Sequence, residues 1–385
     1  MDIAVVGGGV SGVVSAIELS KLGYKVSIYE KTDRLLKKLL ITGNGRCNFS
    51  NKNISRENFH GNKSFLDKVY TDEFIDAREY IINLGIIPYL DERNRFYPMS
   101  LQAQSVVEAL LKEVEDKDIN CFFKSEVISI NKNKKFTIKT KDTSKDYDRV
   151  IFSAGSMSYP STGTDGSQYK LVEDLGHTKT KLYPGIGPLI ADIPFSKELK
   201  GLRLNATVYA GDKSCNGDLL FTENGISGNS IFELSSYILR EKIDKIYIDF
   251  LPLVDLDDLK IILKLRQDKL NDVDSKWFLN GIIHKRLYKV FFKMLNVKTT
   301  KDIDIDKLCK LIKNYEVSNI RAGSWALSQI TVGGINTDEI DTNLESKIHK
   351  GIYFTGEVLD VDGDCGGYNL TWAIYSALLV AKMLR

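Results

Sequence analysis

The sequence has few of the residues that build metal centres and disulfide frameworks. It contains 5 cysteines and 4 histidines in 385 residues. The cysteine count is odd and no Cys-x-x-Cys pair occurs, which argues against a disulfide framework, a zinc ribbon and a dithiol redox pair. The histidines are scattered and no His-Glu-x-x-His motif occurs. We therefore expect no metal site.

Long hydrophobic runs are also missing. No apolar stretch is long enough to span a bilayer, so no membrane association is expected. Met1 leads straight into a strand-like run, which argues against a signal peptide and favours the cytoplasm. The composition, with 43% hydrophobic and 27% charged residues, is ordinary for a globular protein. The length allows two or three domains.

The clearest pattern lies in the first thirty residues. Asp2–Val6 is a short apolar strand, and Gly7, Gly9 and Gly12 then fit Gly-x-Gly-x-x-Gly. A mostly apolar helix follows and ends at Gly23. The three glycines permit a tight turn, backbone approach to a pyrophosphate and close packing of helix on strand. The helix N-terminus adds backbone amides and partial positive charge. This pattern predicts dinucleotide binding.

An acidic residue follows the second strand at the expected distance. Glu30 stands 18 residues after Gly12, where it is placed to accept hydrogen bonds from a ribose diol. An acid there favours a free 2′-hydroxyl, and so NAD or the adenosine half of FAD over NADP. These thirty residues alone leave NAD and FAD both open.

The next segments leave alternatives open. The basic cluster at 31–38 either reaches phosphates or is solvated. The glycine- and asparagine-rich stretch 43–51 is either a ligand-binding loop or a surface turn. Helices are expected at 74–84 and near 101–115, the second capped by Ser100. Four further strands, expected as a β-meander, are 120–123, 126–131, 135–140 and 147–153.

The last of these strands runs into Ala154-Gly155, which we expect near the first glycine loop. From about 189 to 255 the pattern changes to short strands with glycine and asparagine turns. Lysine-rich helices are expected between 256 and 313, centred on 259–265, 278–295 and 308–312. Extended structure is expected again at 315–320 and 326–330.

The C-terminus carries a second strand, glycine loop and helix. The strand 351–357 ends in an acid, residues 358–369 form a loop, and an apolar helix follows from Leu370. A second such unit suits a long cofactor such as FAD, with the positive end of the helix near the flavin N1/O2 edge. The loop acids Asp360, Asp362 and Asp364 lack the closing Glu of an EF-hand calcium loop.

Three stretches together resemble the bacterial aminoacetone-oxidase family of FAD-binding flavoproteins. They are Lys38–Asn51, Arg95–Pro98 and Gly356–Leu370, and the likeness covers essentially the whole chain. The most specific pieces are Thr42–Asn48 and Gly356–Leu370. Asn44 is a mild departure, since the family often has glycine or serine near this position.

The resemblance implies an α/β fold: a discontinuous, Rossmann-like FAD domain of the glutathione-reductase type, without a separate NAD(P) domain. A β-rich domain carrying a helical insertion would interrupt it. The expected boundaries are 1–188 and 330–385 for the FAD domain, 189–255 and 314–329 for the β-rich substrate domain, and 256–313 for the insertion. Family members are credited with oxidising small amines, reducing a bile-acid-like enone, and reducing a uridine of large-subunit ribosomal RNA.

FAD is therefore expected to bind noncovalently along both glycine loops. Glu30 and the first loop would hold the adenosine diphosphate half, and the C-terminal loop would approach the isoalloxazine ring. The expected cofactor-binding residues are Gly7, Gly9, Val10, Ser11, Gly12, Glu30, Lys31, Lys38, Leu39, Gly45, Arg46, Val127, Ala154, Gly155, Gly356, Glu357, Asp364, Gly366, Gly367, Tyr368, Asn369 and Leu370.

Two cysteines are candidates for catalysis. Cys47 and Cys365 both lie in glycine-rich loops, where either thiol would act as a general acid and protonate a carbon next to the one that receives hydride. The alternative is that both are small loop residues. Arg46 is a further catalytic candidate, and Tyr368 follows if neither cysteine contributes.

The number of dinucleotide fingerprints bears on the reductant, and the distribution of charged residues bears on the substrate class. Only one dinucleotide fingerprint occurs, so NADH or NADPH would dock transiently over the flavin in a ping-pong scheme. Between Lys260 and Lys313 there are 14 Lys+Arg and 6 Asp, net +8 against +2 for the chain. This basic insertion is either a solvated face or the footprint of a polyanion.

An RNA partner would make uridine reduction in 23S rRNA the leading specific function. A small-molecule flavin oxidase or reductase is the alternative, and a non-catalytic FAD-binding module is the second. The sequence leaves the oligomeric state undetermined.

Overall fold

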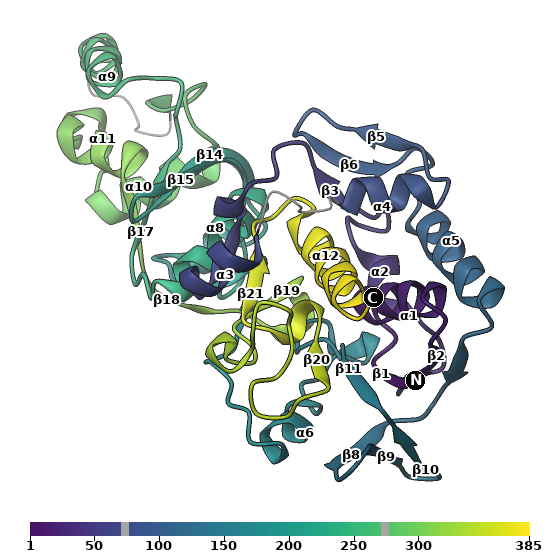
Figure 1. Cartoon of the computed structure of the whole chain (residues 1–385). Helices are drawn as coiled ribbons and strands as arrows, with labels where there is room; N and C mark the ends of the chain where they lie inside the picture. Colours follow the sequence, from purple (N-terminus) through teal and green to yellow (C-terminus); the bar gives the residue numbers. More distant parts are fainter. Residues whose placement is uncertain (71–76, 271–276) are drawn as a thin grey trace. The chain divides into compact units, whose positions relative to one another are not determined.

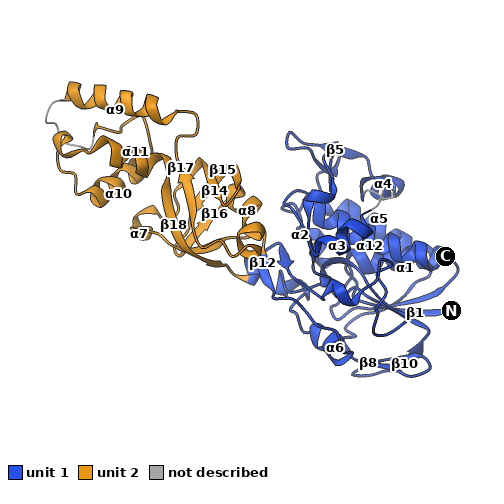
Figure 2. Cartoon of the chain, turned by 60° about the vertical axis from the view of Figure 1, so that its left-hand side comes forward, with its two compact units in different colours: residues 1–184, 325–385 blue, residues 185–324 orange. Residues whose placement is uncertain are grey.

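The computed structural model describes residues 1–70, 77–270 and 277–385. The chain divides into two compact units, residues 1–184 with 325–385 and residues 185–324 (Figure 2). The second unit is inserted between two parts of the first. The sequence placed these breaks after residues 188 and 329, and it treated 256–313 as a separate part.

Unit 1 is built on a five-stranded parallel sheet. Most residues of its inner strands are apolar and buried, as expected for a parallel sheet covered on both faces, while the edge strand at residues 120–122 is only partly buried. The first glycine loop leaves the central strand at its carboxyl end. In spatial order the strands are β20 (Ile352–Phe354), β11 (Arg149–Phe152), β1 (Asp2–Val6), β2 (Lys25–Tyr29) and β7 (Asn120–Phe122).

Three long helices pack beside this sheet (Figure 1). They are α1 (Val10–Lys21), α5 (Ala103–Asp116) and α12 (Tyr368–Met383), and α1 packs against both others. The predicted cap of α5 is wrong, because the helix begins after Gln102. The Ser100 hydroxyl instead pairs with that of Ser105.

The predicted β-meander is only partly present. Strands β8 (Val127–Lys132), β9 (Phe136–Thr140) and β10 (Ser144–Tyr147) form an antiparallel sheet of their own. The flanking strands β7 and β11 instead join the parallel sheet beside β2 and β1. Short connections between strands suggested hairpins, but β7 and β11 instead pair in parallel with β2 and β1, and β11 is buried there on both faces.

Small sheets and short helices complete unit 1. The helix predicted at 74–84 is described from Ala77 onward, and its residues 74–76 lie outside the described part. Of the extended segment expected at 326–330, the first two residues lie in a 3₁₀ turn and Ile330 begins strand β19. The remaining elements are α2 (Lys37–Ile41), β3 (Ser50–Asn51), η1 (Arg56–Asn58), β4 (Phe59–Gly61), α3 (Lys63–Val69), α4 (Ala77–Asn83), β5 (Pro88–Leu90), β6 (Arg95–Pro98), η2 (Pro160–Thr162), α6 (Tyr169–Asp174), β12 (Tyr183–Gly185), η5 (Trp325–Leu327), β19 (Ile330–Val332), η6 (Thr337–Glu339), η7 (Gly356–Val358) and β21 (Val361–Gly363).

Unit 2 is a closed six-stranded barrel with helices attached. The sequence missed α8 (Asn229–Arg240), whose buried serines weakened its apolar pattern. The predicted helix at 278–295 begins only at Lys285, because His284 caps it. In barrel order the strands are β13 (Leu189–Asp192), β16 (Gly225–Ser227), β15 (Lys213–Phe221), β14 (Arg203–Ala210), β17 (Ile246–Asp249) and β18 (Tyr315–Ala322). The other helices are α7 (Ser196–Leu199), α9 (Leu256–Leu270), α10 (Lys285–Leu295), η4 (Thr300–Asp302) and α11 (Ile305–Lys313).

Candidate functional site

The three glycines of the first loop have different surroundings. A Cβ on Gly7 would lie 2.5 Å from the carbonyl oxygen of Ser153, and one on Gly12 would lie 2.0 Å from the carbonyl oxygen of Gly7. These two positions exclude a side chain because the backbone packs against them. A Cβ on Gly9 would meet nothing within 4 Å. Gly9 therefore faces open space where a ligand can approach.

The N-terminus of α1 is electrostatically open. Its N-cap is Gly9, no side chain caps it, and its first turn holds no acidic residue. The helix begins with Val10, Ser11 and Gly12, whose amides belong to the turn that lacks intrahelical partners. Their partial positive charge suits a pyrophosphate.

Glu30 lies directly beside this loop. One of its carboxylate oxygens accepts a hydrogen bond from the amide of Gly8 at 2.8 Å, and the other accepts from the amide of Thr32 at 2.7 Å. Two backbone amides thus fix the carboxylate, and each oxygen retains acceptor capacity for a ribose diol. The carboxylate therefore lies beside the first glycine loop, and its contact with a ribose remains a prediction.

Lys31 points to carboxylates of unit 1. Its ammonium lies 2.8 Å from Asp165 and 3.4 Å from Glu126. Burial by itself would raise the pKa of Asp165, but hydrogen bonds from Lys31 and Ser167 outweigh this effect and lower the pKa to about 2. The charge of Lys31 is therefore already paired. Val127, the next predicted residue along the chain, is buried at the start of β8.

The predicted Ala154–Gly155 turn lies against the first loop. Just before it, the hydroxyl of Ser153 donates to the carbonyl of Val6 at 3.1 Å, or to that of Gly7 at 3.3 Å. Gly155 has a positive φ of 74°, which lets the chain turn away from the sheet. The end of β11 thus brings backbone groups beside the β1–α1 turn.

The C-terminal segment reaches the same place. A Cβ on Gly356 would lie 2.5 Å from the hydroxyl oxygen of Ser11. The next residue, Glu357, forms an ion pair with Lys38 at 2.6 Å and accepts from the amide of Thr331 at 2.7 Å. Gly356 therefore closes over the start of α1, while Glu357 and Lys38 hold each other.

The second glycine loop rests on the loop at 43–51. The amide of the Asn51 side chain donates to the carbonyl of Gly366 at 3.1 Å, and a Cβ on Gly367 would lie 2.4 Å from the carbonyl oxygen of Ser50. Helix α12 begins at Tyr368, two residues before the predicted Leu370, with no acidic residue in its first turn. Its N-terminus is as open to negative charge as that of α1.

Two predicted residues, Asn369 and Asp364, shape this second loop together with His60 and Asn58, which the sequence did not single out. Asn369 accepts from the amide of Gly363 at 2.8 Å and donates to its carbonyl at 2.9 Å. The carboxylate of Asp364 pairs with His60 at 2.7 Å and accepts from Asn58 at 3.1 Å. His60 lies in β4, which pairs with β21, so only this distant pairing brings it to Asp364.

Arg46 lies over an aromatic ring at the same loop. Its guanidinium is 5.0 Å from the centre of the Tyr97 ring, and its Nε donates to the carbonyl of Gly43 at 3.2 Å. Burial raises the pKa of the Tyr97 hydroxyl, and the half-buried Cys365 lies close enough to influence it. Arg46 and Tyr97 thus lie together, with Cys365 in their neighbourhood, and the sequence pattern pointed to no role for Tyr97.

Cys47 has a different environment from Cys365. Its side chain is fully buried in the core of unit 1, where Leu39 also packs. Burial raises the pKa of the Cys47 thiol to about 12, and a hydrogen bond with Thr42 opposes the rise. The neighbouring Gly45 accepts from the amide of Ala103 at 2.8 Å. These surroundings suit a structural residue better than a proton donor.

The whole chain matches one protein family. Residues 1–383 match the family described as the HI0933-like protein Rossmann domain. The chain belongs to this family. It is accordingly an FAD-dependent oxidoreductase with a Rossmann-type FAD domain, and several relatives and structural neighbours are reductases or dehydrogenases. The predicted family, fold class and enzyme class are confirmed.

Its curated relatives act on unlike molecules. The chain is 30% identical to the 3-dehydro-bile acid delta(4,6)-reductase of Clostridium scindens, over 99% of this chain and 98% of that protein. It is 27% identical to the ribosomal RNA dihydrouridine synthase of Escherichia coli, over 100% and 98%. The 3-ketosteroid delta1-dehydrogenase of Sterolibacterium denitrificans has a similar fold, with a TM-score of 0.50, 12% identity and coverage of 100% and 99%.

The residues of unit 1 fit FAD. Gly9 leaves room for a pyrophosphate, Glu30 is held where a ribose diol would meet it, and two uncapped helix N-termini face the two glycine loops. Among the described residues, no group of three His, Cys, Asp or Glu side chains is placed to hold a metal ion. No helix in the described ranges is long and apolar enough to cross a membrane.

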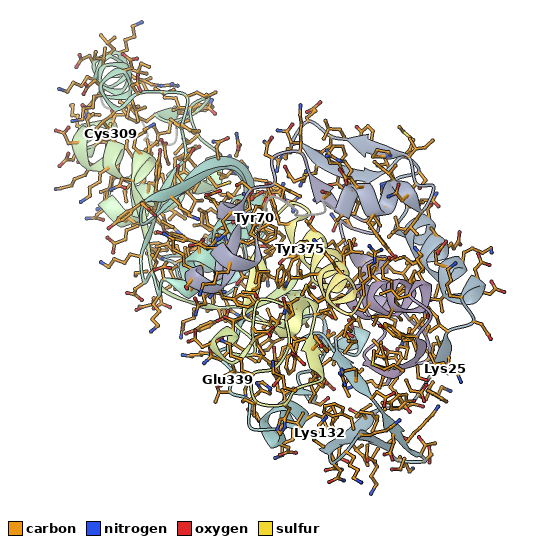
Figure 3. All side chains as sticks on the ribbon, viewed as in Figure 1. Lys25, Tyr70, Lys132, Cys309, Glu339 and Tyr375 are labelled. Carbon is orange, nitrogen blue, oxygen red and sulfur yellow. The ribbon has the colours of Figure 1, made fainter. Side chains whose placement is uncertain are left out.

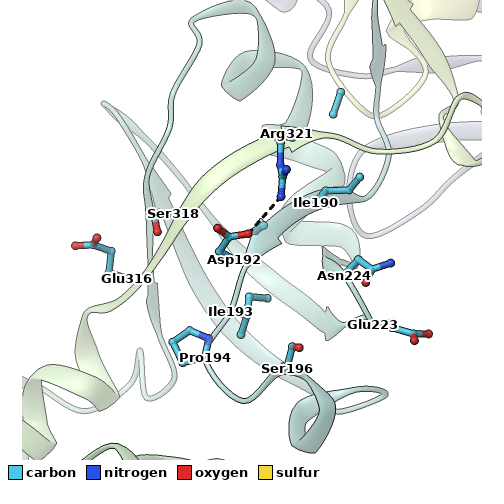
Figure 4. Close-up of a pocket in the computed structure, with 12 residues that line it drawn as sticks. Ile190, Asp192, Ile193, Pro194, Ser196, Glu223, Asn224, Glu316, Ser318 and Arg321 are labelled. Carbon is cyan, nitrogen blue, oxygen red and sulfur yellow. Dashed lines mark hydrogen bonds and ion pairs between the residues drawn. The ribbon is translucent and has the colours of Figure 1, made fainter.

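A separate pocket of about 950 Å³ lies in unit 2 (Figure 4). An ion pair between Asp192 and Arg321 at 3.2 Å lies within it. Two further lining acids, Glu223 and Glu316, pair with Lys200 and Lys245. None of the predicted site residues lines this pocket.

Proposed function

We propose that this enzyme reduces a carbon–carbon double bond conjugated to a carbonyl group. The observation that carries the proposal is the chemistry shared by the relatives' names. The delta(4,6) double bonds of a 3-dehydro bile acid and the C5–C6 double bond of uridine are both conjugated to a carbonyl. One flavin site can therefore serve substrates whose remaining parts differ.

Residues around the second glycine loop suit this reaction. Bound FAD, once reduced, would supply the hydride. The guanidinium of Arg46 is exposed beside Tyr97, where it would bind the carbonyl oxygen on which negative charge develops. Cys365 would supply the proton to the carbon beside the one that receives hydride. Cys47, the other candidate, is buried away from any substrate.

Variants at this cluster test the assignment. Arg46→Gln is expected to lower kcat/KM by 10²–10³-fold, the typical loss of one transition-state donor. Arg46→Lys should restore part of it, because the charge remains. Cys365→Ser should lower turnover while FAD content stays unchanged. Full turnover in both Arg46→Gln and Cys365→Ser would contradict these roles.

A uridine of 23S rRNA is the more specific substrate we propose. It is supported by the name of the 27%-identical relatives and by the excess of basic residues between 260 and 313. Hydride would reach uracil C6 and the proton C5. The base must be unstacked to meet the flavin, so an unfolded or partly assembled RNA is the expected substrate.

Nucleoside mass spectrometry of 23S rRNA, with and without the gene, tests this substrate. Loss of dihydrouridine in the deletion strain, restored by the wild-type gene and not by the Arg46→Gln variant, is the expected result. Unchanged dihydrouridine, together with RNA binding that does not depend on salt, would remove the RNA hypothesis.

A small-molecule substrate is the second candidate. The 30% identity to a bile-acid reductase, across nearly all of both chains, favours a steroid-like enone. Turnover of a 3-keto-4,6-diene steroid by the purified enzyme would support it. An amine such as aminoacetone is the other small-molecule alternative, with oxygen reoxidising the flavin.

The reductant we propose is NADH or NADPH, bound transiently. The glycine fingerprint at residues 7–12 is occupied by FAD in this scheme, so the nicotinamide must leave before substrate enters. Anaerobic stopped-flow mixing should bleach the flavin with one of the two nucleotides. Bleaching by an amine but by neither nucleotide would favour an amine oxidase instead.

A further inference from the structure

Helix α9 carries apolar side chains on two opposite faces. Leu259 and Leu263 are buried where α9 packs on α11. Ile261, Ile262 and Leu265 lie on the other side and are 57%, 44% and 59% exposed. At 3.6 residues per turn these three cover an arc of about 100°, opposite the buried pair. In both views α9 lies at the edge of the helical part of unit 2, with α11 between it and α10 (Figures 1 and 2).

This second face is unusual for a monomer. A surface helix normally has one apolar stripe, and a helix that is apolar on opposite sides is normally buried on both. Leu253, just before α9, is 99% exposed. Large exposed apolar patches mark surfaces where another molecule binds, and Ile261, Ile262 and Leu265 share one exposed face of α9.

Two charges border the face at its ends. Asp258 in the first turn and Lys269 in the last both point within about 40° of the direction of Leu265. They stand about 16 Å apart along the axis, so they do not pair within one helix. The face thus has an acid at one end and a base at the other, while Asp268 and Arg266 border its two sides. A polyanion would require a net positive face, whereas this arrangement complements itself.

We propose that this face binds the same face of a second copy of the chain, with the two α9 helices antiparallel. When the two-fold axis passes between Leu263 and Lys264, Ile262 meets Leu265 of the other copy. The same register places Asp258 opposite Lys269 of the other copy, twice in the dimer. An isologous contact of this kind closes and yields a dimer rather than a filament.

Charge reversal tests the register. Asp258→Lys and Lys269→Asp alone each create two like-charge contacts and should weaken the dimer at least about tenfold. The double variant should return to within about threefold of the wild-type dissociation constant, because the pairs re-form with reversed sign. The double variant places a base at the N-terminus of α9 and an acid at its C-terminus, and both charges oppose the helix dipole. Restored dimerisation therefore cannot come from a more stable helix.

Sedimentation velocity measures the dissociation constant of the dimer. The protein concentration should run from about 1 to about 100 µM, the range in which weak complexes form. Leu265→Asp should leave only monomer, while Lys289→Asp on α10 serves as a matched surface control. Equal melting temperatures show that the variants fold. A wild-type protein that stays monomeric overturns the proposal, as does a dimer indifferent to the reversals. So does a monomer that binds phosphatidylglycerol vesicles through Leu265.

Discussion

At the level of single residues, the glycines of the first loop divide into those that packing requires and one that the ligand requires. Gly12 packs against the backbone of Gly7, so Gly12→Ala should cost about 1–3 kcal/mol of folding stability or more. Gly9 has φ −73° and open space around its Cβ position. Gly9→Ala should therefore leave apoprotein stability unchanged, or raise it by up to about 1 kcal/mol.

FAD binding should distinguish Gly9→Ala from Gly12→Ala in another way. A methyl group on Gly9 occupies the space where the pyrophosphate would approach, so Gly9→Ala should bind FAD at least tenfold more weakly. Urea unfolding of the apoproteins and fluorescence titration with FAD measure the two effects. If Gly9→Ala bound FAD normally, the open face of Gly9 would not be the cofactor site.

Glu30 is the second residue whose role is testable by itself. Glu30→Ala should weaken FAD binding by about 1–3 kcal/mol, the worth of hydrogen bonds to a buried charged group. Part of any loss comes from the amides of Gly8 and Thr32, which the carboxylate now satisfies. Glu30→Gln retains an acceptor for one of them and should bind FAD with intermediate affinity. Glu115→Gln, at an exposed position, is the control.

The reactivity of the cysteines follows from burial. Because burial raises the pKa of Cys47 to about 12, almost no thiolate exists at pH 8, and the side chain is inaccessible. Iodoacetamide at pH 8 should leave Cys47 unmodified in the native protein and modify the partly exposed Cys215. Peptide mass spectrometry checks both. Rapid modification of Cys47 in folded protein would show that this loop opens.

At the level of elements, His177 ties the end of α6 to the segment at 336–346. Its Nδ1 lies 2.9 Å from Glu339, labelled in Figure 3, and its Nε2 lies 2.9 Å from the hydroxyl of Ser346. Burial lowers the pKa of His177 below 6.5, although Glu339 opposes this. Burial raises the pKa of Glu339, but hydrogen bonds from Thr178 and His177 outweigh it and lower the pKa below 4.5.

The lowered pKa values of His177 and Glu339 predict that the folded protein loses stability in mild acid. The unfolded chain binds a proton at His177 more readily than the folded one, so its contribution is complete above pH 6.5 and is lost as the pH falls. Glu339 adds a further loss below pH 4.5. Urea unfolding from pH 7.5 to 5 should show wild-type stability falling by up to about 1.4 kcal/mol per pH unit. His177→Gln should flatten that slope.

At the level of the whole molecule, charge is distributed less simply than the basic insertion suggested. Residues 185–324 together hold 22 Lys+Arg and 19 Asp+Glu, a net charge of only +3. Several lysines of the insertion pair with acids of unit 2, including Lys260 with Asp306, Lys293 with Glu198 and Lys313 with the buried Asp249. Any RNA contact would therefore depend on the lysines outside such pairs.

Lys285 and Lys289 on α10 are exposed, and one helical turn apart, so they are the sharpest test of RNA binding. If both contact phosphates of a single strand, the double Gln variant should reduce the slope of log K against log salt by about 1.4. Lys112→Gln with Lys170→Gln in unit 1 is the matched control. Identical slopes in wild type and variant would show that this helix does not bind RNA.

The cofactor site of unit 1 could be predicted in large part from the sequence, because its key contacts are local. The turn at Gly7, the close approach at Gly12 and the reach of Glu30 to Gly8 all lie within one strand–helix–strand unit. Turn geometry and helical periodicity act over such short separations, so spacing alone is enough to predict this candidate dinucleotide site. The apolar C-terminal helix was predictable for the same reason, to within two residues of its start.

Tertiary structure alone decided what depends on distant partners. Alternating apolar residues show that β7 and β11 are strands, but only packing places them in the parallel sheet. His60 pairs with Asp364, which lies 304 residues away in the sequence, and the guanidinium of Arg46 lies over the ring of Tyr97. Burial likewise separates Cys47 from Cys365, although both stand in similar glycine-rich loops. Pairing and burial depend on side chains far away in the sequence, so local spacing cannot determine them.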